Sequence, residues 1–273
     1  MDRIRLIASD MDATLLDEQS QLPADFEETI HALTELGIRF APASGRPLYT
    51  LEAMFPTLQD ELVFIGDNGG AIRWKGQNLF TSEMSPEGWR ALNRLTREQG
   101  DIAVLCGLES AYVERPFAVH DAVLRHFYTK IEYVDRLEDV TAPADKFTIY
   151  LPQHNAQQAY DTVYASQRSI YSVAVAGECW VDIMNPGVHK GAALQTLGQL
   201  WGLPSESIMA FGDTYNDAEM LRTAKYGFLM ENGSVPLRRN VPFLAPSNRE
   251  AGVMQVLHRV LAQNGCVCPE DFV

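Results

Sequence analysis

Cationic residues are scarce in this chain of 273 residues, which has 22 lysines and arginines against 36 aspartates and glutamates. The resulting formal net charge of −14 argues against a nucleic-acid backbone or an anionic membrane as the main partner. An anionic small molecule would need a local positive site on such a protein. We therefore expect a small-molecule ligand, no nucleic acid and no membrane partner, and a monomer or homodimer.

Long apolar runs and a leader-like start are also missing. No apolar stretch approaches the roughly 18 residues that a membrane-spanning helix needs. The start, MDRIRLIASDMDATLL, lacks the cationic, apolar and small-residue regions of a signal peptide. The few cysteines are too scattered for a usual zinc framework, so we expect reduced thiols at Cys106, Cys179, Cys266 and Cys268. These features favour a cytoplasmic protein.

Strand-like and helix-like segments alternate in the first and last parts of the chain. The composition is 46% hydrophobic. Strands are expected at 4–10, 38–44, 61–66, 207–213 and 226–230. Helices are expected between them at 23–37, 47–55, 190–203 and 216–224. This alternation predicts an α/β fold with a doubly wound, Rossmann-like parallel sheet.

The rhythm changes between about residues 83 and 183. Strand-like segments at 103–116, 146–152 and 169–184 are interleaved with helical stretches near 86–99 and 154–168. We expect an inserted domain of α+β character at 83–183. The core would then be discontinuous, made of residues 1–82 and 184–273.

Two acidic clusters follow predicted core strands. Asp10 and Asp12 come with Thr14 in DMDAT, and Asp213 comes with Asn216 and Asp217 in GDTYND. Each cluster alone could be an ordinary loop or a capped helix start. Ligands on doubly wound sheets sit beyond the carboxyl ends of the strands, so the two clusters would share one edge. Crowded carboxylates there are unfavourable without a cation, and hard oxygen ligands suit Mg²⁺.

Two further segments could recognise a phosphate. Ser44 and Gly45 in ASGRP offer a hydroxyl and backbone donors at a helix start, where an anion is favoured. Lys190 in NPGVHKGAAL lies in the first turn of a predicted helix, where the helix dipole disfavours a cation. A plain solvated lysine remains an alternative for it. Arg46 and Asn68 are weaker candidates, since an ion pair and a turn would explain them equally well.

Together, DMDAT, SGR, Lys190 and GDTYND resemble in order and spacing the four motifs of the haloacid-dehalogenase-like superfamily. The segments GDNGG, NPGVHKG and MENGSVPLRR fit the same resemblance, and the inserted domain resembles the type IIB cap of the Cof-type phosphatases. The resemblance implies a magnesium-dependent phosphatase for small phosphorylated metabolites, with sugar phosphates as the expected class. A phosphomutase or other phosphoryl transferase, and a signalling module phosphorylated on aspartate, are the alternatives.

The resemblance also implies roles for individual residues. Asp10 would be the nucleophile, Asp12 the acid and base, and Lys190 the group that stabilises charge on the phosphoryl oxygens. The implied phosphate contacts are Thr14, Ser44, Gly45, Asn216 and the Met11 amide. The implied Mg²⁺ ligands are Asp10, the Asp12 carbonyl and Asp213, with Asp217 as an outer partner. The family commonly has glycine where this chain has Ala13, so we expect that turn to keep ordinary dihedral angles.

Overall fold

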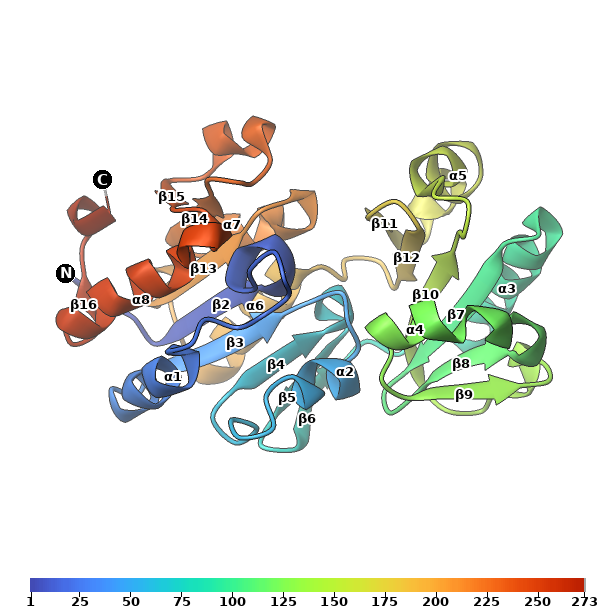
Figure 1. Cartoon of the computed structure of the whole chain (residues 1–273), viewed down its shortest axis with the longest axis horizontal. Helices are drawn as coiled ribbons and strands as arrows, with labels where there is room; N and C mark the ends of the chain where they lie inside the picture. The colour runs from blue at the N-terminus through green and yellow to red at the C-terminus, as the bar shows by residue number, and fades with distance from the viewer. Residues whose placement is uncertain (273) are drawn as a thin grey trace.

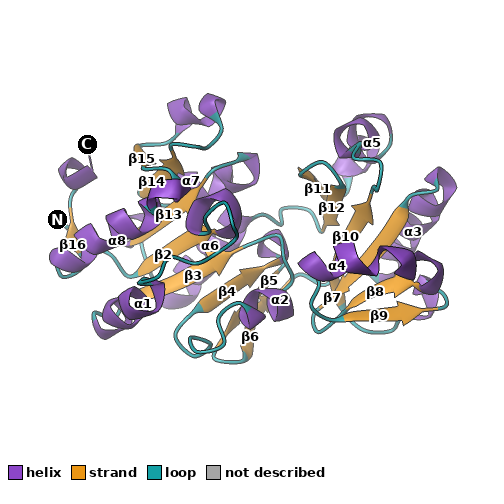
Figure 2. Cartoon of the chain, viewed as in Figure 1, coloured by secondary structure: helices purple, strands orange, loops and turns teal. Residues whose placement is uncertain are grey.

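Two β-sheets with helices packed on them make up the computed structural model, which describes residues 1–272. Figure 1 shows the larger sheet with both chain termini on one side and the smaller sheet on the other. Figure 2 shows that helices flank the strands of each sheet. The predicted α/β doubly wound core is confirmed, and we refer to the part formed by residues 86–184 as the cap.

The core sheet has eight strands in the order β15-β14-β13-β2-β3-β4-β5-β6. Its strands are β2 (Leu6–Asp10), β3 (Arg39–Ala43), β4 (Val63–Gly66), β5 (Ala71–Trp74), β6 (Gln77–Thr81), β13 (Ile208–Gly212), β14 (Tyr226–Met230) and β15 (Phe243–Ala245). The six strands from β15 to β4 are parallel, whereas β5 and β6 add an antiparallel hairpin at one edge. A short pair, β1 (Asp2–Arg3) and β16 (Cys266–Val267), lies apart from this sheet.

Helices cover both faces of the core sheet because its central strands are apolar on both sides. Ile7 of β2 belongs to the apolar cluster that includes α1 and α8, and its neighbours Leu6 and Ala8 belong to the cluster that includes α6 and α7. The core helices are α1 (Phe26–Glu35), α2 (Leu48–Ala53), α6 (Lys190–Trp201), α7 (Ala218–Thr223) and α8 (Gly252–Ala262). Because helices pack on both faces of the sheet, the carboxyl ends of its strands are held in fixed positions along one edge.

The cap is built around a six-stranded sheet in the order β11-β12-β10-β7-β8-β9, antiparallel except between β8 and β9. Its strands are β7 (Ile102–Gly107), β8 (Ala111–Glu114), β9 (Ile131–Val134), β10 (Ala144–Tyr150), β11 (Ser172–Ala176) and β12 (Trp180–Met184). Its helices are α3 (Pro86–Gln99), α4 (Asp121–Phe127) and α5 (Ala156–Thr162).

Two chain segments, residues 82–85 and 185–189, connect the core with the cap and lie side by side. The Asn185 side-chain amide donates to the Ser82 carbonyl at 3.2 Å and to the Glu83 carbonyl at 2.8 Å. In the first segment, the Met84 amide donates to the Ala144 carbonyl of the cap at 2.8 Å. The Asn185 bonds hold the two segments together, and the Met84 bond ties the first residue of β10 to them.

Several elements differ from the sequence-based expectation. The helix expected at 154–168 is shorter, ending at Thr162 before the six-residue 3₁₀ segment Tyr164–Ser169, and the one expected at 216–224 begins as the turn Tyr215–Asp217 before α7. The boundary expected after residue 183 falls just before the last residue of β12. The division into domains at 82/83 and 183/184 stays a prediction. Among residues 1–272, no helix combines the length and apolarity that crossing a membrane requires.

Candidate active site

The carboxyl ends of three neighbouring core strands bring the predicted acidic and hydroxyl residues together. Asp10 is the last residue of β2, Ser44 follows β3, and Asp213 follows β13. Because β2 pairs with both β3 and β13 in parallel, these three residues lie at one edge of the sheet. Residues some 200 positions apart in the sequence are therefore neighbours, as Figure 1 shows for the strands.

Lys190 is fully buried between two of these carboxylates. It is the first residue of α6, and its ammonium group donates to Asp10 Oδ1 and, at 2.7 Å, to Asp217 Oδ1. Burial alone would lower its pKa, but the charges of Asp10 and Asp217 outweigh burial and hold the pKa above its usual value. The alternative of a solvated lysine is therefore excluded.

Burial also acts on the carboxylates. The pKa of Asp10 is raised to about 8, first by desolvation and then by the charge of Asp217. The same two causes raise the pKa of Asp213 to about 6. Carboxylate oxygens of Asp10, Asp213 and Asp217 lie within 4.8 Å of one another. A single ammonium group cannot balance three carboxylates, so this oxygen-rich cluster fits a divalent cation of the Mg²⁺ type.

Asp217 faces inward and organises its neighbours. Its Oδ2 accepts from the Asp213 amide at 3.0 Å and the Thr214 amide at 3.2 Å, while Oδ1 accepts from Lys190. Gly212 permits this approach, since a Cβ there would lie 2.4 Å from the Asp217 Cβ. Both Asp217 oxygens are thus bound to protein donors, which suits the outer position that the sequence suggested for it.

The turn after β2 corrects the expectation about Ala13. Ala13 has φ 60° and ψ 8°, in the left-handed region, so the prediction of ordinary dihedral angles is wrong. The tight turn is closed by the Leu16 amide, which donates to the Met11 carbonyl at 2.9 Å, and the Asn232 side chain donates to the Ala13 carbonyl at 2.8 Å. Surrounding contacts thus hold alanine in a conformation that costs about 1 kcal/mol.

Two asparagines that hold this turn were missed by the sequence analysis. Besides its bond to Ala13, Asn232 accepts from the Asn248 amide at 3.1 Å, and Asn248 donates from its side chain to the Leu16 carbonyl at 2.9 Å. Asn232 lies in the segment MENGSVPLRR, which the sequence analysis noted without assigning it a role. Nothing in a single sequence indicates that these asparagines reach a turn more than 200 residues away.

Arg46 forms a bidentate ion pair with Asp12. Its Nη1 lies 2.8 Å from Asp12 Oδ2, and its Nη2 donates to Oδ1 at 3.0 Å. The Arg46 backbone amide donates to Ser44 Oγ at 3.1 Å. The guanidinium is mostly buried while Asp12 is exposed, so Arg46 fixes the direction of a carboxylate that would otherwise be free to rotate.

A cavity of about 720 Å³ lies between the core and the cap. From the predicted site, its wall includes Asp10, Asp12, Ser44, Gly45, Asp213 and Asn216. Met11, Thr14, Lys190 and Asp217 are buried behind this wall. Thr14 Oγ1 donates to Asp213 Oδ1 at 3.5 Å, and Asn216 Oδ1 accepts from Thr214 Oγ1 at 2.6 Å.

The cap supplies the opposite wall. Phe127 and Tyr128, at the end of α4, pack edge-on against Trp180 with ring centroids 5.0 and 6.2 Å apart. Lys146 and Thr148 of β10 and Asp182 of β12 line the same space. The cap thus closes the cavity with an aromatic surface beside a polar one, and a small organic molecule fits between this surface and the carboxylates.

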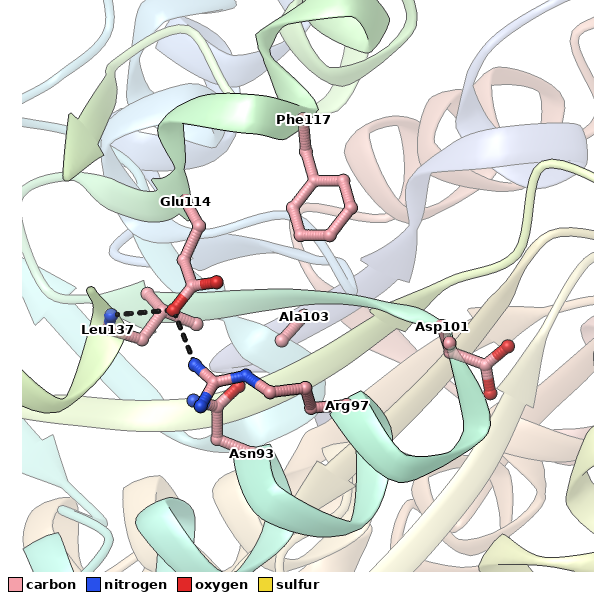
Figure 3. A pocket seen from close by; sticks show the side chains of 8 residues that line it. Asn93, Arg97, Asp101, Ala103, Glu114, Phe117 and Leu137 are labelled. Carbon is pink, nitrogen blue, oxygen red and sulfur yellow. Dashed lines mark hydrogen bonds and ion pairs between the residues drawn. The ribbon is translucent and has the colours of Figure 1, made fainter. Parts of the chain in front are cut away.

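A second cavity lies inside the cap and measures only about 80 Å³. Figure 3 shows Arg97 directed toward Glu114, which also accepts from the Leu137 amide. Arg97 Nη1 lies 3.3 Å from Glu138 Oε1 as well. Arg97 is thus already paired with two carboxylates, and the cavity is much smaller than the roughly 300 Å³ of a typical ligand pocket.

The comparisons with known proteins agree with this geometry. A family model for haloacid dehalogenase-like hydrolases matches residues 7–257. The 5-amino-6-(5-phospho-D-ribitylamino)uracil phosphatase YbjI of Escherichia coli is 32% identical over 94% of this chain and 96% of its own. The HMP-PP phosphatase of Cronobacter sakazakii is 31% identical over 88% of this chain and 89% of its own.

A solved structure shows the same fold. The SMU.1108c protein of Streptococcus mutans superposes with a TM-score of 0.84 at 30% identity, covering 95% of this chain and 99% of its own. The match to the family model takes in all four sequence motifs, and the named relatives at this level of identity are phosphatases. The chain is therefore a phosphatase that belongs to the haloacid dehalogenase-like hydrolase family.

Proposed function

We propose that this phosphatase hydrolyses small phosphate monoesters with Mg²⁺, through a phosphoryl group carried on Asp10. The observation that carries the proposal is the position of Asp10. It lies on the cavity wall with Lys190, Asp213 and Asp217 behind or beside it and Asp12 two residues further along the turn. The proposed nucleophile and proton carrier thus lie at one strand end, beside an ammonium group and an acidic cluster that could hold a cation.

In the first step, an Asp10 carboxylate oxygen attacks phosphorus, the bond from phosphorus to the leaving oxygen breaks, and protonated Asp12 gives its proton to that oxygen. In the second step, a water attacks the phosphoryl group, Asp12 takes the water proton, and the bond to Asp10 breaks to release inorganic phosphate. Asp12 therefore acts in both steps. Arg46 keeps it directed at the cavity.

The donor set supports Mg²⁺ as the cation. Asp10, the Asp12 backbone carbonyl and Asp213 would hold it, and Asp217 would orient the site from behind. A cation bound there neutralises charge on the phosphoryl oxygens. Ser44, Asn216 and the backbone amides of Met11 and Gly45 are the proposed phosphate contacts, and Thr14 orients Asp213 through its hydrogen bond.

We propose a phosphorylated sugar or polyol as the substrate class. One relative is named for a substrate that carries a phosphoribityl chain on a uracil. The cavity volume of about 720 Å³ accommodates such a molecule, and its wall includes polar side chains such as Thr148 and His154 beside the aromatic surface of the cap. Release of inorganic phosphate from such esters, with Mg²⁺ and no added acceptor, tests hydrolysis against transfer to a second substrate.

Replacing Asp213 tests the cation site. Asp213→Asn removes one of the proposed direct ligands, so we expect Mg²⁺ binding to weaken by more than the roughly 10- to 100-fold that losing a residue behind the ligands costs, and kcat to fall with it. Binding is measured without turnover, from the rise in unfolding temperature as Mg²⁺ is added. Asp60→Asn, on the exposed surface, is the control. Activity that survives complete chelation of divalent cations contradicts the cation site.

Replacing an aromatic residue of the cap tests its share in substrate choice. Phe127→Leu alters the cap wall of the cavity and none of the proposed catalytic residues, so we expect the ratio of kcat/KM between two esters to change about tenfold. Decay of the phosphoenzyme should stay within about twofold, because the alcohol has already left. Single-turnover quench experiments measure that decay, with the exposed Val123→Ala on the same helix as control. If Phe127→Leu slows phosphoenzyme decay as much as it changes the ratio of kcat/KM, the aromatic wall does not act on substrate choice alone.

A further inference from the structure

Lys146 is a buried cation that the proposed chemistry does not use. It lies on cap strand β10, its side chain is 2% exposed, and it contacts the cavity between the two parts of the protein. Its ammonium group donates to the Gly45 carbonyl and lies 3.1 Å from Asp67 Oδ1 and 3.6 Å from Asp182 Oδ2. Its hydrogen bond thus goes to a backbone carbonyl of the core, and the two carboxylates balance its charge.

The Gly45 carbonyl belongs to the turn that carries Ser44 and Arg46. Three successive carbonyls of this turn accept hydrogen bonds. The Asn68 amide donates to the Ser44 carbonyl and the Asp67 amide to the Arg46 carbonyl, both at 2.9 Å. These two donors are core residues of the turn that follows β4, whereas the middle carbonyl is held by Lys146 from the cap.

The same contacts extend to the acid-base residue. The Arg46 amide donates to Ser44 Oγ, and the Arg46 guanidinium holds Asp12 in the bidentate pair. A shift of the Gly45 peptide would therefore displace Ser44, a proposed phosphate contact, on one side. On the other side it would displace Arg46, which holds Asp12. Displacements of this kind, even of about 1 Å, can cost about 100-fold in rate.

Lys146 is itself held in place by charges from both parts. Asp67 belongs to the core and Asp182 to cap strand β12. Asp182 also accepts from Asn68 Nδ2 at 2.9 Å and from Thr148 Oγ1 at 2.7 Å. Burial would lower the pKa of Lys146, but the charges of Asp182 and Asp67 hold it well above its usual value. The lysine is thus a fixed cation directed at one carbonyl.

We propose that Lys146 is a positioning residue of the cap that acts through the Gly45 carbonyl on Ser44 and Arg46, and through Arg46 on Asp12. The inference rests on the proposed function and deepens it, since it gives the cap a part in the chemistry as well as in substrate choice. Because Asp12 serves both steps, the effect of Lys146 does not depend on the leaving group. Lys146 differs in this respect from the aromatic wall of the cavity.

The test compares Lys146→Met with Lys130→Met, an exposed lysine of the cap. Steady-state rates are measured on one phosphate ester with a small leaving group and one with a large leaving group, together with single-turnover decay of the phosphoenzyme. We expect Lys146→Met to lower kcat about 100-fold on both esters, to slow decay by a similar factor and to change KM less than about threefold. Lys130→Met should match the wild type.

Loss of Lys146 removes the cation that lies beside the buried carboxyl groups of Asp67 and Asp182, so a second variant separates misfolding from mispositioning. Lys146→Met combined with Asp67→Asn removes both partners, while Asp182 keeps its bonds from Asn68 and Thr148. We expect this double variant to recover most of the unfolding temperature and none of the kcat. Recovery of both would mean that Lys146 has only a structural role and would overturn the inference.

Two further outcomes are distinguishable. If Lys146→Met changes only the ratio between the two esters and leaves phosphoenzyme decay at the wild-type rate, Lys146 is a contact for the leaving group and the inference is wrong while the proposed function stands. If the wild type releases no phosphate from either ester, the proposed function itself is wrong and the inference falls with it.

Discussion

Asp10→Asn abolishes phosphate release, with kcat expected to fall about 10⁴-fold or further while the fold is retained. The amide has nearly the shape of the carboxylate and still offers Lys190 an oxygen acceptor, but it cannot attack phosphorus. Burial and Asp217 raise the pKa of Asp10 to about 8 in spite of Lys190, and Lys190 keeps Asp217 as a partner, so neutralising Asp10 should leave the unfolding temperature within a few degrees of the wild type.

The Asp10→Asn measurement needs two readouts. Phosphate release is followed under saturating ester and Mg²⁺, and acid-quenched protein is examined for a bound phosphoryl group. The exposed Asp60→Asn serves as control for the chemistry of the substitution itself. Phosphate release above about one hundredth of the wild-type rate would contradict covalent catalysis by Asp10, because direct attack by water would then suffice.

Most site residues at the carboxyl edge of the core sheet could be predicted from the sequence, because they share one position: the end of an apolar strand. Asp10, Ser44 and Asp213 each come at or just after the end of an apolar strand, and parallel strands place such ends together. Lys190 could be singled out because a cation in the first turn of a helix is unfavourable unless something compensates it. The structure shows the compensation as Asp10 and Asp217.

The contribution of the cap could not be predicted in the same way. Lys146 and Asp182 reach the core only because β10 pairs with β12 in a register that puts Thr148 opposite Asp182 and Lys146 opposite Met184. A shift of one residue would turn these side chains to the other face of the sheet. No short-range pattern fixes that register, so the sequence suggests the strands without indicating which of their residues face the cavity.

The error at Ala13 has a physical cause as well. Propensity correctly disfavours alanine at positive φ, but the bond from Asn232 to the Ala13 carbonyl and the closure of the turn outweigh a cost of about 1 kcal/mol. Both stabilising contacts depend on tertiary structure. Local preference therefore fails at a position where distant residues hold the catalytic turn.

Lys190→Met is expected to have the second large effect, acting on rate and stability together. The substitution leaves Asp10, Asp213 and Asp217 as three buried carboxylates without the ammonium group that now lies between two of them. Breaking a buried pair in this way costs about 3–5 kcal/mol of stability. The pKa of Asp10, already raised to about 8, loses the one neighbour that lowers it, so a larger share of the nucleophile is protonated.

The broken ion pairs and the protonation of Asp10 predict a fall in kcat of about 10³-fold for Lys190→Met, accompanied by a lower unfolding temperature. Added Mg²⁺ should restore part of the stability, because a cation bound by the same carboxylates offsets their repulsion, but it should not restore the rate. Denaturant unfolding with and without Mg²⁺, and single-turnover phosphate release, measure the two effects separately. Lys130→Met, exposed on the cap, is the matched control.

If Mg²⁺ restored both stability and rate, Lys190 would serve only to hold the carboxylates together. Charge stabilisation on the phosphoryl group would then have to come from the cation and the backbone amides of the turn.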